Sequence, residues 1–415
     1  MKKSEVFNKY ANCISPAKAG FFLQSGLDFV FGKREGAFIW DMEDNKTLIN
    51  CHSNGGVFNL GHRNPLVISA LEEALKTLDI GNHHFVSQQK ANLAEKLATL
   101  CPGDLNHVIF GVSGGEAIDL AIKISRKATG RKKIICIEGG YHGHTGLALA
   151  AGAPKFSKPF LSDSEDFIAV PFNSLSAMNS AFSKDVAAVI LEPIPATAGI
   201  LIPEETYLKG VKEICEANHS LFIADEVQTG LGRTGKFWCV EYDSIVPDIL
   251  VTGKGLSGGI YPITATILRE GLQWVFQEDP FLHISTFGGA DIGCIVAEKV
   301  LELSSDLVFL ENVRSISEFL HKGLRNLIQK YSKLMPSYHA KGMMMGLKMV
   351  SPELGPFMSK ACYEAGLLCI YSGNDPSVVQ FLPPLIIDKQ IASEILLRLD
   401  SALQFLGNFL SHNRV

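Results

Sequence analysis

Apolar residues in the middle of the chain follow two alternating spacings. Short, nearly continuous apolar runs occur at KIICI, VAAVILEP, LFIAD and ILVTG, which is typical of strands buried on both faces of a parallel sheet. Between and before these runs, apolar residues recur at helical spacing, at Ile118, Ala121 and Ile122 and again at Leu208, Val211, Ile214 and Cys215. This alternation predicts an α/β fold with a mainly parallel sheet for residues 56–310.

The two ends of the chain have different patterns. The stretch FVFGKREGAFIWDMEDNKTLIN has two β-rich runs around turn residues and predicts a small antiparallel unit. After Asp306, apolar residues indicate one long amphipathic helix, at Leu310, Val313, Ile316, Leu320 and Leu324. Short strands around MMMGLKMV and LLCIY and a final helix follow. We therefore expect a second, smaller α+β domain, formed by residues 311–415 with a contribution from residues 1–55.

Composition narrows the class of protein and of partner. The chain has 415 residues, 47% of them hydrophobic, and a net charge of −5 with both signs scattered along it. Nothing suggests a nucleic-acid footprint or a basic membrane patch, so a small molecule is the expected partner. The nine cysteines show no C-x-x-C and are expected to be reduced thiols. With no apolar leader or membrane span, we expect a soluble, cytoplasmic protein.

Asp225 and Lys254 each follow an apolar run, in LFIADEVQTGLGRTG and DILVTGKGLSGG. Alone, either residue would ordinarily be a surface side chain or a helix cap. The flanking residues favour a functional site, because a strand at 221–224 would bring Asp225 to the rim of the sheet, where ligands bind. Gly253 and Gly255 leave the lysine backbone uncrowded. An amine for a Schiff base and a carboxylate for a protonated pyridine nitrogen are what pyridoxal 5′-phosphate requires.

Two glycine-rich turns could also contribute to this site. In GVSGGEA, Gly114 and Gly115 open a helix whose free N–H groups could bind a phosphate, although small residues there can equally serve tight packing. In EGGYHGHTG, Tyr141 could cover one face of a planar cofactor or belong to the core. His142 and His144 form an H-x-H pair, but spacing supplies no third ligand, so no metal site is predicted.

In this order and spacing, several motifs resemble those of the class III pyridoxal-phosphate aminotransferases, relatives of the ornithine, 4-aminobutyrate and glutamate-1-semialdehyde enzymes. They are GVSGGEA, GGYHGHT, LEPI, FIADEVQTGLGRTG, TGKGLSGG and HISTFGGAD. The resemblance covers nearly the whole chain. It implies a fold-type I enzyme with a large cofactor-binding domain and a small α+β domain.

The resemblance also implies roles for residues around the cofactor ring. Lys254 would form the Schiff base and later carry a proton between the substrate and the cofactor. Asp225 would pair with the pyridinium nitrogen. Tyr141 would stack on one ring face, Val227 would pack on the other, and Gln228 would hydrogen-bond the ring hydroxyl.

Further residues are implied at the phosphate. Ser113, Gly114 and Gly115 would hold it, and Thr286 in STFGG would reach it from the neighbouring subunit, so that a homodimer has two shared active sites. Glu192 in LEPI matches an acid near the cofactor in the family, although a structural partner for this carboxylate remains an equal alternative.

Two departures from the family concern the substrate. Where many members have an arginine before F-x-P-P-L, this chain has Gln380, so bidentate binding of an α-carboxylate is lost. Where some members have a glutamate that neutralises that arginine, EPIPATAGI offers Thr197. This joint loss suggests a substrate other than an ordinary α-amino acid. We expect Phe21, Phe22 and Gln380 to line the pocket that presents the amine to Lys254.

These observations predict an aminotransferase that moves an amino group from a primary amine or ω-amino compound to a carbonyl acceptor. A fold-related lyase such as an ammonia-lyase, an epimerase or an aminomutase is the alternative, since all of these need the same lysine and aspartate. A regulator that keeps the fold without catalysis is a third possibility, which the intact Lys254 disfavours.

Overall fold

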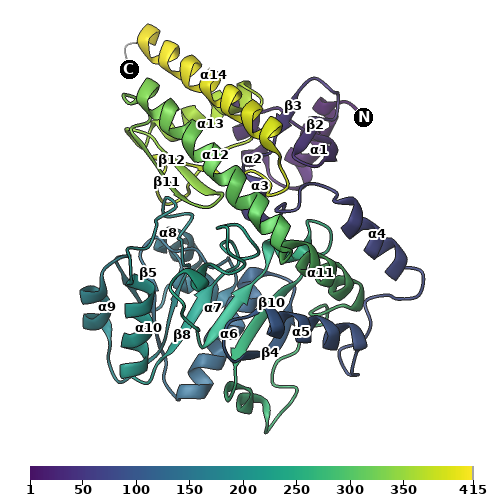
Figure 1. Ribbon diagram of the computed structural model, residues 1–415, viewed down its shortest axis with the longest axis vertical. Coiled ribbons are helices and arrows are strands. Elements are labelled where there is room, and N and C mark those ends of the chain that lie inside the picture. Colours follow the sequence, from purple (N-terminus) through teal and green to yellow (C-terminus); the bar gives the residue numbers. More distant parts are fainter. Residues whose placement is uncertain (414–415) are drawn as a thin grey trace.

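A computed structural model describes residues 1–413, and the chain forms two lobes (Figure 1). The large lobe, below in the figure, contains a seven-stranded sheet of order β4-β10-β9-β8-β7-β5-β6. Its strands are β4 (Leu105–Gly111), β5 (Lys133–Ile137), β6 (Phe167–Val170), β7 (Val186–Leu191), β8 (Leu221–Asp225), β9 (Ile249–Thr252) and β10 (Thr264–Arg269). Only β10 pairs antiparallel, with β4 and β9. The predicted α/β fold with a mainly parallel sheet is confirmed.

Apolar residues occupy almost every position of β7, β8 and β9 because helices cover both faces of the sheet. In β8, Phe222 and Ala224 pack into one core cluster, while Leu221 and Ile223 pack into the cluster on the other face. The α-helices of this lobe are α4 (Pro65–Ala74), α5 (Gln88–Leu100), α6 (Gly114–Thr129), α7 (Gly146–Ala151), α8 (Pro154–Ser157), α9 (Leu175–Ala181), α10 (Tyr207–Ala217) and α11 (Asp291–Ser304). Short 3-10 helices are η1 (Lys158–Phe160), η2 (Cys239–Tyr242), η3 (Lys254–Ser257) and η4 (Leu272–Phe276). Alternating side chains of one strand thus serve two cores.

The small lobe contains two antiparallel sheets. Near the N-terminus are β1 (Phe31–Glu35), β2 (Phe38–Asp41) and β3 (Thr47–Ile49), and the second sheet has the order β11-β12-β14-β13. Its strands are β11 (Ser337–Lys341), β12 (Met344–Lys348), β13 (Ile370–Tyr371) and β14 (Val378–Phe381). The remaining helices are α1 (Lys3–Cys13), α2 (Pro16–Gln24), α3 (Ser53–Gly56), α12 (Leu307–Tyr331), α13 (Leu354–Glu364) and α14 (Lys389–Asn413).

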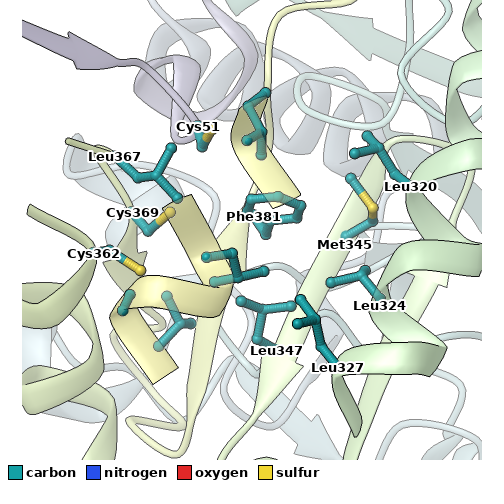
Figure 2. Close-up of a cluster of buried hydrophobic side chains, with 14 of the residues drawn as sticks. Cys51, Leu320, Leu324, Leu327, Met345, Leu347, Cys362, Leu367, Cys369 and Phe381 are labelled. Atoms are coloured by element: carbon teal, nitrogen blue, oxygen red, sulfur yellow. The ribbon is translucent and has the colours of Figure 1, made fainter. Parts of the chain in front are cut away.

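The N-terminal sheet and the C-terminal elements share one hydrophobic core. The Ile49 N–H donates to the carbonyl of Gly366, and the Leu368 N–H donates to the carbonyl of Ile49, both at 2.9 Å. Cys51 packs in the same cluster as Leu320 and the other side chains drawn in Figure 2. Segments from opposite ends of the chain therefore depend on each other for burial. No helix among residues 1–413 is long and apolar enough to cross a membrane.

Candidate active site

Four neighbouring strands deliver polar residues to one edge of the large sheet. Asp225 is the last residue of β8, Glu192 follows β7, His142 follows β5, and Lys254 begins η3 just after β9. Parallel strands present their carboxyl ends on the same side, which is where open α/β sheets bind ligands. The topology therefore brings together residues that are more than a hundred positions apart in the sequence.

Lys254 has a strained backbone and a buried amine. Its φ of 43° lies in the left-handed region, which costs a non-glycine residue on the order of 1 kcal/mol or more. Its Nζ donates to Oε1 of Gln228 at 3.1 Å. Burial lowers the pKa of Lys254, and the carboxylates of Asp225 and Glu192 partly oppose this effect. A lowered pKa increases the fraction of neutral amine, which is the nucleophilic form.

Asp225 is held by two partners at the end of its strand. It is 4% exposed, its Oδ2 lies 2.7 Å from Nδ1 of His142, and its Oδ1 accepts from the Val227 N–H at 3.1 Å. Burial disfavours the charged ring of His142, but the hydrogen bond and charge of Asp225, with Glu192, outweigh it and raise the pKa of His142. The short contact with His142 and the hydrogen bond from Val227 therefore fix the orientation of the Asp225 carboxylate.

His142 is the functional residue that sequence reasoning missed. In the sequence, the H-x-H pair suggests only a metal-binding motif, which lacks a third ligand, and not the source of a partner for Asp225. The usable signal was Asp225 itself, because a carboxylate at the end of a buried strand needs a polar partner. The other ring nitrogen of His142, Nε2, is buried and has no hydrogen-bond partner within the described chain.

Glu192 lies beside this pair. Its Oε1 accepts from the Tyr141 N–H at 3.0 Å, so it holds the backbone of the segment that carries the aromatic ring. Burial, with a contribution from Asp225, raises the pKa of Glu192 to about 7, although His142 and Lys254 oppose the shift. The hydrogen bond from the Tyr141 amide favours a structural role for Glu192. Its effect on the pKa of His142 is consistent with the alternative, an acid near the cofactor.

The Ser-Gly-Gly turn forms the N-terminus of α6. Ser113 is the N-cap, and its Oγ accepts from the Glu116 N–H at 3.2 Å. A β-carbon on Gly115 would lie 2.6 Å from the Thr145 hydroxyl, so this glycine is required for close packing. The first turn of the 16-residue helix still presents free N–H groups, as an anion site needs. The packing role of the turn is therefore observed, and phosphate binding stays a prediction.

Val227 and Gln228 connect this turn to the lysine. A β-carbon on Gly114 would meet Val227 Cγ1 at 3.5 Å, and one on Gly253 would meet the same atom at 3.6 Å. The Nε2 of Gln228 is buried without a hydrogen-bond partner in residues 1–413, while its Oε1 accepts the hydrogen bond from Lys254. Tyr141 is half-buried, with its ring centroid 5.4 Å from that of His144 in an edge-to-face arrangement.

The residues expected at the substrate lie on different elements. Gln380 is in β14 and is 6% exposed. Because strand residues alternate, it shares a face with Val378 and Leu382, which pack against Ile194 of the large lobe, and not with the Figure 2 core that contains Phe381. The Oγ1 of Thr197 donates to the Gly139 carbonyl at 3.4 Å.

Three other predicted site residues are more exposed to solvent than Gln380: Phe21, Phe22 and Thr286. Phe21 is 53% exposed on α2, and its ring packs edge-to-face on Phe22 with centroids 5.7 Å apart. Their role at the substrate stays a prediction. Thr286 is exposed in the single chain and lies between two exposed apolar residues, Ile284 and Phe287.

Known proteins resemble this chain in sequence and in structure. The family model for class III aminotransferases matches residues 24–403. A protein of Archaeoglobus fulgidus described as an aminotransferase is 52% identical over 402 residues, covering 97% of this chain and 94% of that protein. Ornithine aminotransferase of Toxoplasma gondii ME49 superposes with a TM-score of 0.90 at 25% identity, covering 98% and 96%. Acetylornithine aminotransferase of Elizabethkingia anophelis gives 0.80 at 27% identity, covering 94% and 99%. The chain belongs to the class III aminotransferase family.

Proposed function

We propose that the protein is a pyridoxal 5′-phosphate-dependent aminotransferase whose donor is a primary amine or ω-amino compound and whose acceptor is a carbonyl compound. The observation that carries this proposal is the pairing, at one sheet edge, of a lysine with a lowered pKa and a buried aspartate held by a histidine. When bound, the cofactor supplies an aldehyde that takes up amino groups and a ring that withdraws electrons.

The residues present fit this cofactor. Gln228 Nε2 and His142 Nε2 are buried nitrogens without partners in the described part of the chain. Asp225 is the carboxylate for a ring nitrogen, and the N-terminus of α6 at Ser113, Gly114 and Gly115 suits a phosphate. Tyr141 and Val227 would contact the two ring faces.

Each polar side chain has a distinct task in this proposal. Lys254 moves the proton, because its lowered pKa makes the neutral amine, which can accept and return a proton, more available than in an exposed lysine. Asp225 would hold the ring nitrogen of the bound cofactor protonated, and His142 orients that carboxylate through the 2.7 Å contact between its Nδ1 and Oδ2 of Asp225. Gln228 orients the lysine amine through its 3.1 Å hydrogen bond.

Gln380 supports the substrate class. A guanidinium at this position would bind an α-carboxylate through two hydrogen bonds, and an amide cannot supply that charge. The face of β14 that carries Gln380 otherwise presents Val378, and Leu382 follows on the same face. A donor that presents its amine far from any carboxylate agrees with this neutral surface, as does the ω-amino chemistry suggested by the ornithine aminotransferase neighbour.

We also propose a homodimer with shared sites in the cytoplasm. Exposed apolar residues cluster around Thr286, at Phe281, Leu282, Ile284 and Phe287. Burial of this cluster against a second copy would bring Thr286 to the neighbouring phosphate. All nine cysteines are unpaired, which supports a reducing compartment. Sedimentation or light scattering combined with cofactor titration tests the dimer: a monomer that binds cofactor as tightly as the undiluted protein contradicts shared sites.

A two-step absorbance experiment tests the reaction itself. Amines and amino acids are added singly to the cofactor-loaded protein while the band at about 410–430 nm is followed. An aminotransferase loses this band with the donor, regains it when a carbonyl compound is added, and releases no ammonia. Release of ammonia in step with turnover would instead establish the lyase alternative.

A further inference from the structure

Arg233 is a buried cation with an unusual set of partners. Its side chain is fully buried, yet no carboxylate lies within 4.0 Å of it in residues 1–413. Its guanidinium donates to the carbonyls of Met343 at 3.2 Å and Pro383 at 2.7 Å, and to Asn59 Oδ1 at 2.6 Å. A buried charge bound only by neutral oxygens is costly, so these oxygens must be held firmly in place.

The three acceptors come from different parts of the molecule. Met343 immediately precedes β12, and Pro383 lies two residues after the end of β14, the strand that carries Gln380. The backbone of Arg233 bonds to the same segment, since its carbonyl accepts from the Met343 N–H at 3.0 Å. One side chain of the large lobe thus binds two neighbouring strands of the small lobe.

The third acceptor, Asn59, packs against the segment that carries Lys254. A β-carbon on Gly255, the residue after Lys254, would lie 3.0 Å from Asn59 Nδ2. The Asn59 carbonyl also accepts from the Leu385 N–H at 2.8 Å. Asn59 therefore packs on the lysine segment while it bonds to the chain that leaves β14.

We propose that Arg233 is a positioning residue, which through Asn59 sets the orientation of β14 and its Gln380 relative to the segment that carries Lys254. Arginine suits this task because its planar fork reaches several acceptors at once, whereas lysine presents a point charge. Burial lowers the pKa of Arg233 to about 9, which still leaves it charged at neutral pH. The proposal holds whichever substrate the enzyme uses.

Hydrogen–deuterium exchange of the cofactor-loaded protein tests this proposal. Arg233→Met and Asn59→Ala should each raise exchange by about tenfold in two separate segments, residues 378–385 and residues 253–259. Arg233→Lys keeps the charge but not the fork and should give intermediate values. If Arg233→Met does not fold, Asn59→Ala, which leaves the cation in place, decides the test.

Arg131→Met is the matched control. Arg131 also donates to carbonyls, of Val186 at 3.1 Å and Asn218 at 2.9 Å, but both lie at the amino edge of the large sheet, away from Lys254. Its loss should raise exchange only around residues 186–191 and 218–225. Unchanged exchange at residues 378–385 in Asn59→Ala, or an equal rise there in Arg131→Met, overturns the proposal.

A spectroscopic readout separates positioning from general destabilisation. The pH at which the absorbance of the bound cofactor changes reports the surroundings of Lys254. It should move by about half a pH unit or more in Arg233→Lys and Asn59→Ala, and not in Arg131→Met. Loss of thermal stability in all three variants with no shift in this pH would reduce Arg233 to a structural residue and contradict the proposal.

Discussion

The two sides of the proposed site differ sharply in charge. The edge of the large sheet brings together the buried residues Asp225, His142 and Glu192 and the partly buried Lys254, and their charges shift one another's pKa values. The face of β14 opposite the small-lobe core presents Gln380 among apolar neighbours. In the proposed function, the groups for bond-making chemistry and the groups for recognition therefore come from different lobes, and only the first set is ionisable.

This division has an electrostatic reason. In the cluster at the edge of the large sheet, Asp225 and Glu192 favour the charged forms of both His142 and Lys254. The face of β14 that carries Gln380 is neutral, so it adds no charge that would shift the pKa values of these residues. A charged substrate group would need a partner on β14, and Gln380 supplies only an amide.

The largest effect is expected on the charged side from Lys254→Ala. It removes the amine that binds the cofactor covalently and moves the proton, so turnover should fall by about 10³-fold or more. Steady-state rates and circular dichroism measure this loss with the fold intact. Lys212→Ala, which removes a half-buried lysine that pairs with Asp248, is the control and should keep its activity. Full activity of Lys254→Ala without added amine would remove the assignment.

Asp225→Ala is expected to rank second. Loss of the preorganised carboxylate should lower kcat by about 10²–10³-fold, with a smaller effect on the thermal midpoint. Asp248→Ala is the matched comparison, because Asp248 is equally buried but binds Lys212, Arg269 and the Phe222 amide at the other end of the strands. Asp248→Ala should be less stable than the native protein, but its kcat per cofactor-loaded chain should be unchanged. Near-normal turnover of Asp225→Ala contradicts its role.

The neutral side is tested by Gln380→Arg. A guanidinium there should tighten binding of α-carboxylate donors by about 1.5–3 kcal/mol, which is seen as a lower KM for glutamate. Gln380→Lys, with a charge but no planar fork, should gain less. The native enzyme should use glutamate and 2-oxoglutarate poorly. Efficient turnover of this pair by the native enzyme would show that another residue binds the carboxylate.

The smallest expected effect is a pH dependence of stability in the cofactor-free protein. The raised pKa of Glu192, about 7 against an ordinary 4.5, means that its favourable contribution is complete below about pH 4.5 and is lost as pH rises through about 7. The raised pKa of His142 acts in the same direction above about pH 6.5. The contribution of Glu192 should therefore lower the thermal midpoint as pH rises through this range, against the opposite contributions of His52 and His62, whose pKa values burial lowers to about 4.

Glu192→Gln should flatten this dependence by at most about 1.4 kcal/mol per pH unit. Glu226→Gln is the matched variant, because burial also raises the pKa of Glu226 to about 7, yet its carboxylate bonds to Thr229 and the Val240 amide. Both substitutions should flatten the stability profile, but only Glu192→Gln should also move the pH dependence of the cofactor absorbance. An unchanged profile in Glu192→Gln would show that its carboxyl is ionised throughout.

Local sequence determined much of the fold and the identity of the family. Continuous apolar runs predicted β5, β7, β8 and β9, because strands covered on both faces need apolar residues at every position. The same runs located Asp225 and Lys254 at strand ends. The predicted domain boundaries and the substrate roles of Phe21 and Phe22 stay predictions.

Only the tertiary structure decided which polar groups pair. His142 meets Asp225 across 83 positions, and Arg233 meets Asn59 across 174, so no local pattern could reveal either contact. The physical reason is that spacing along the chain determines burial and periodicity, whereas pairing inside the protein depends on which strands lie side by side. The sequence therefore determined which chemical groups are available at the sheet edge, and the order β9-β8-β7-β5 decided which of them act together.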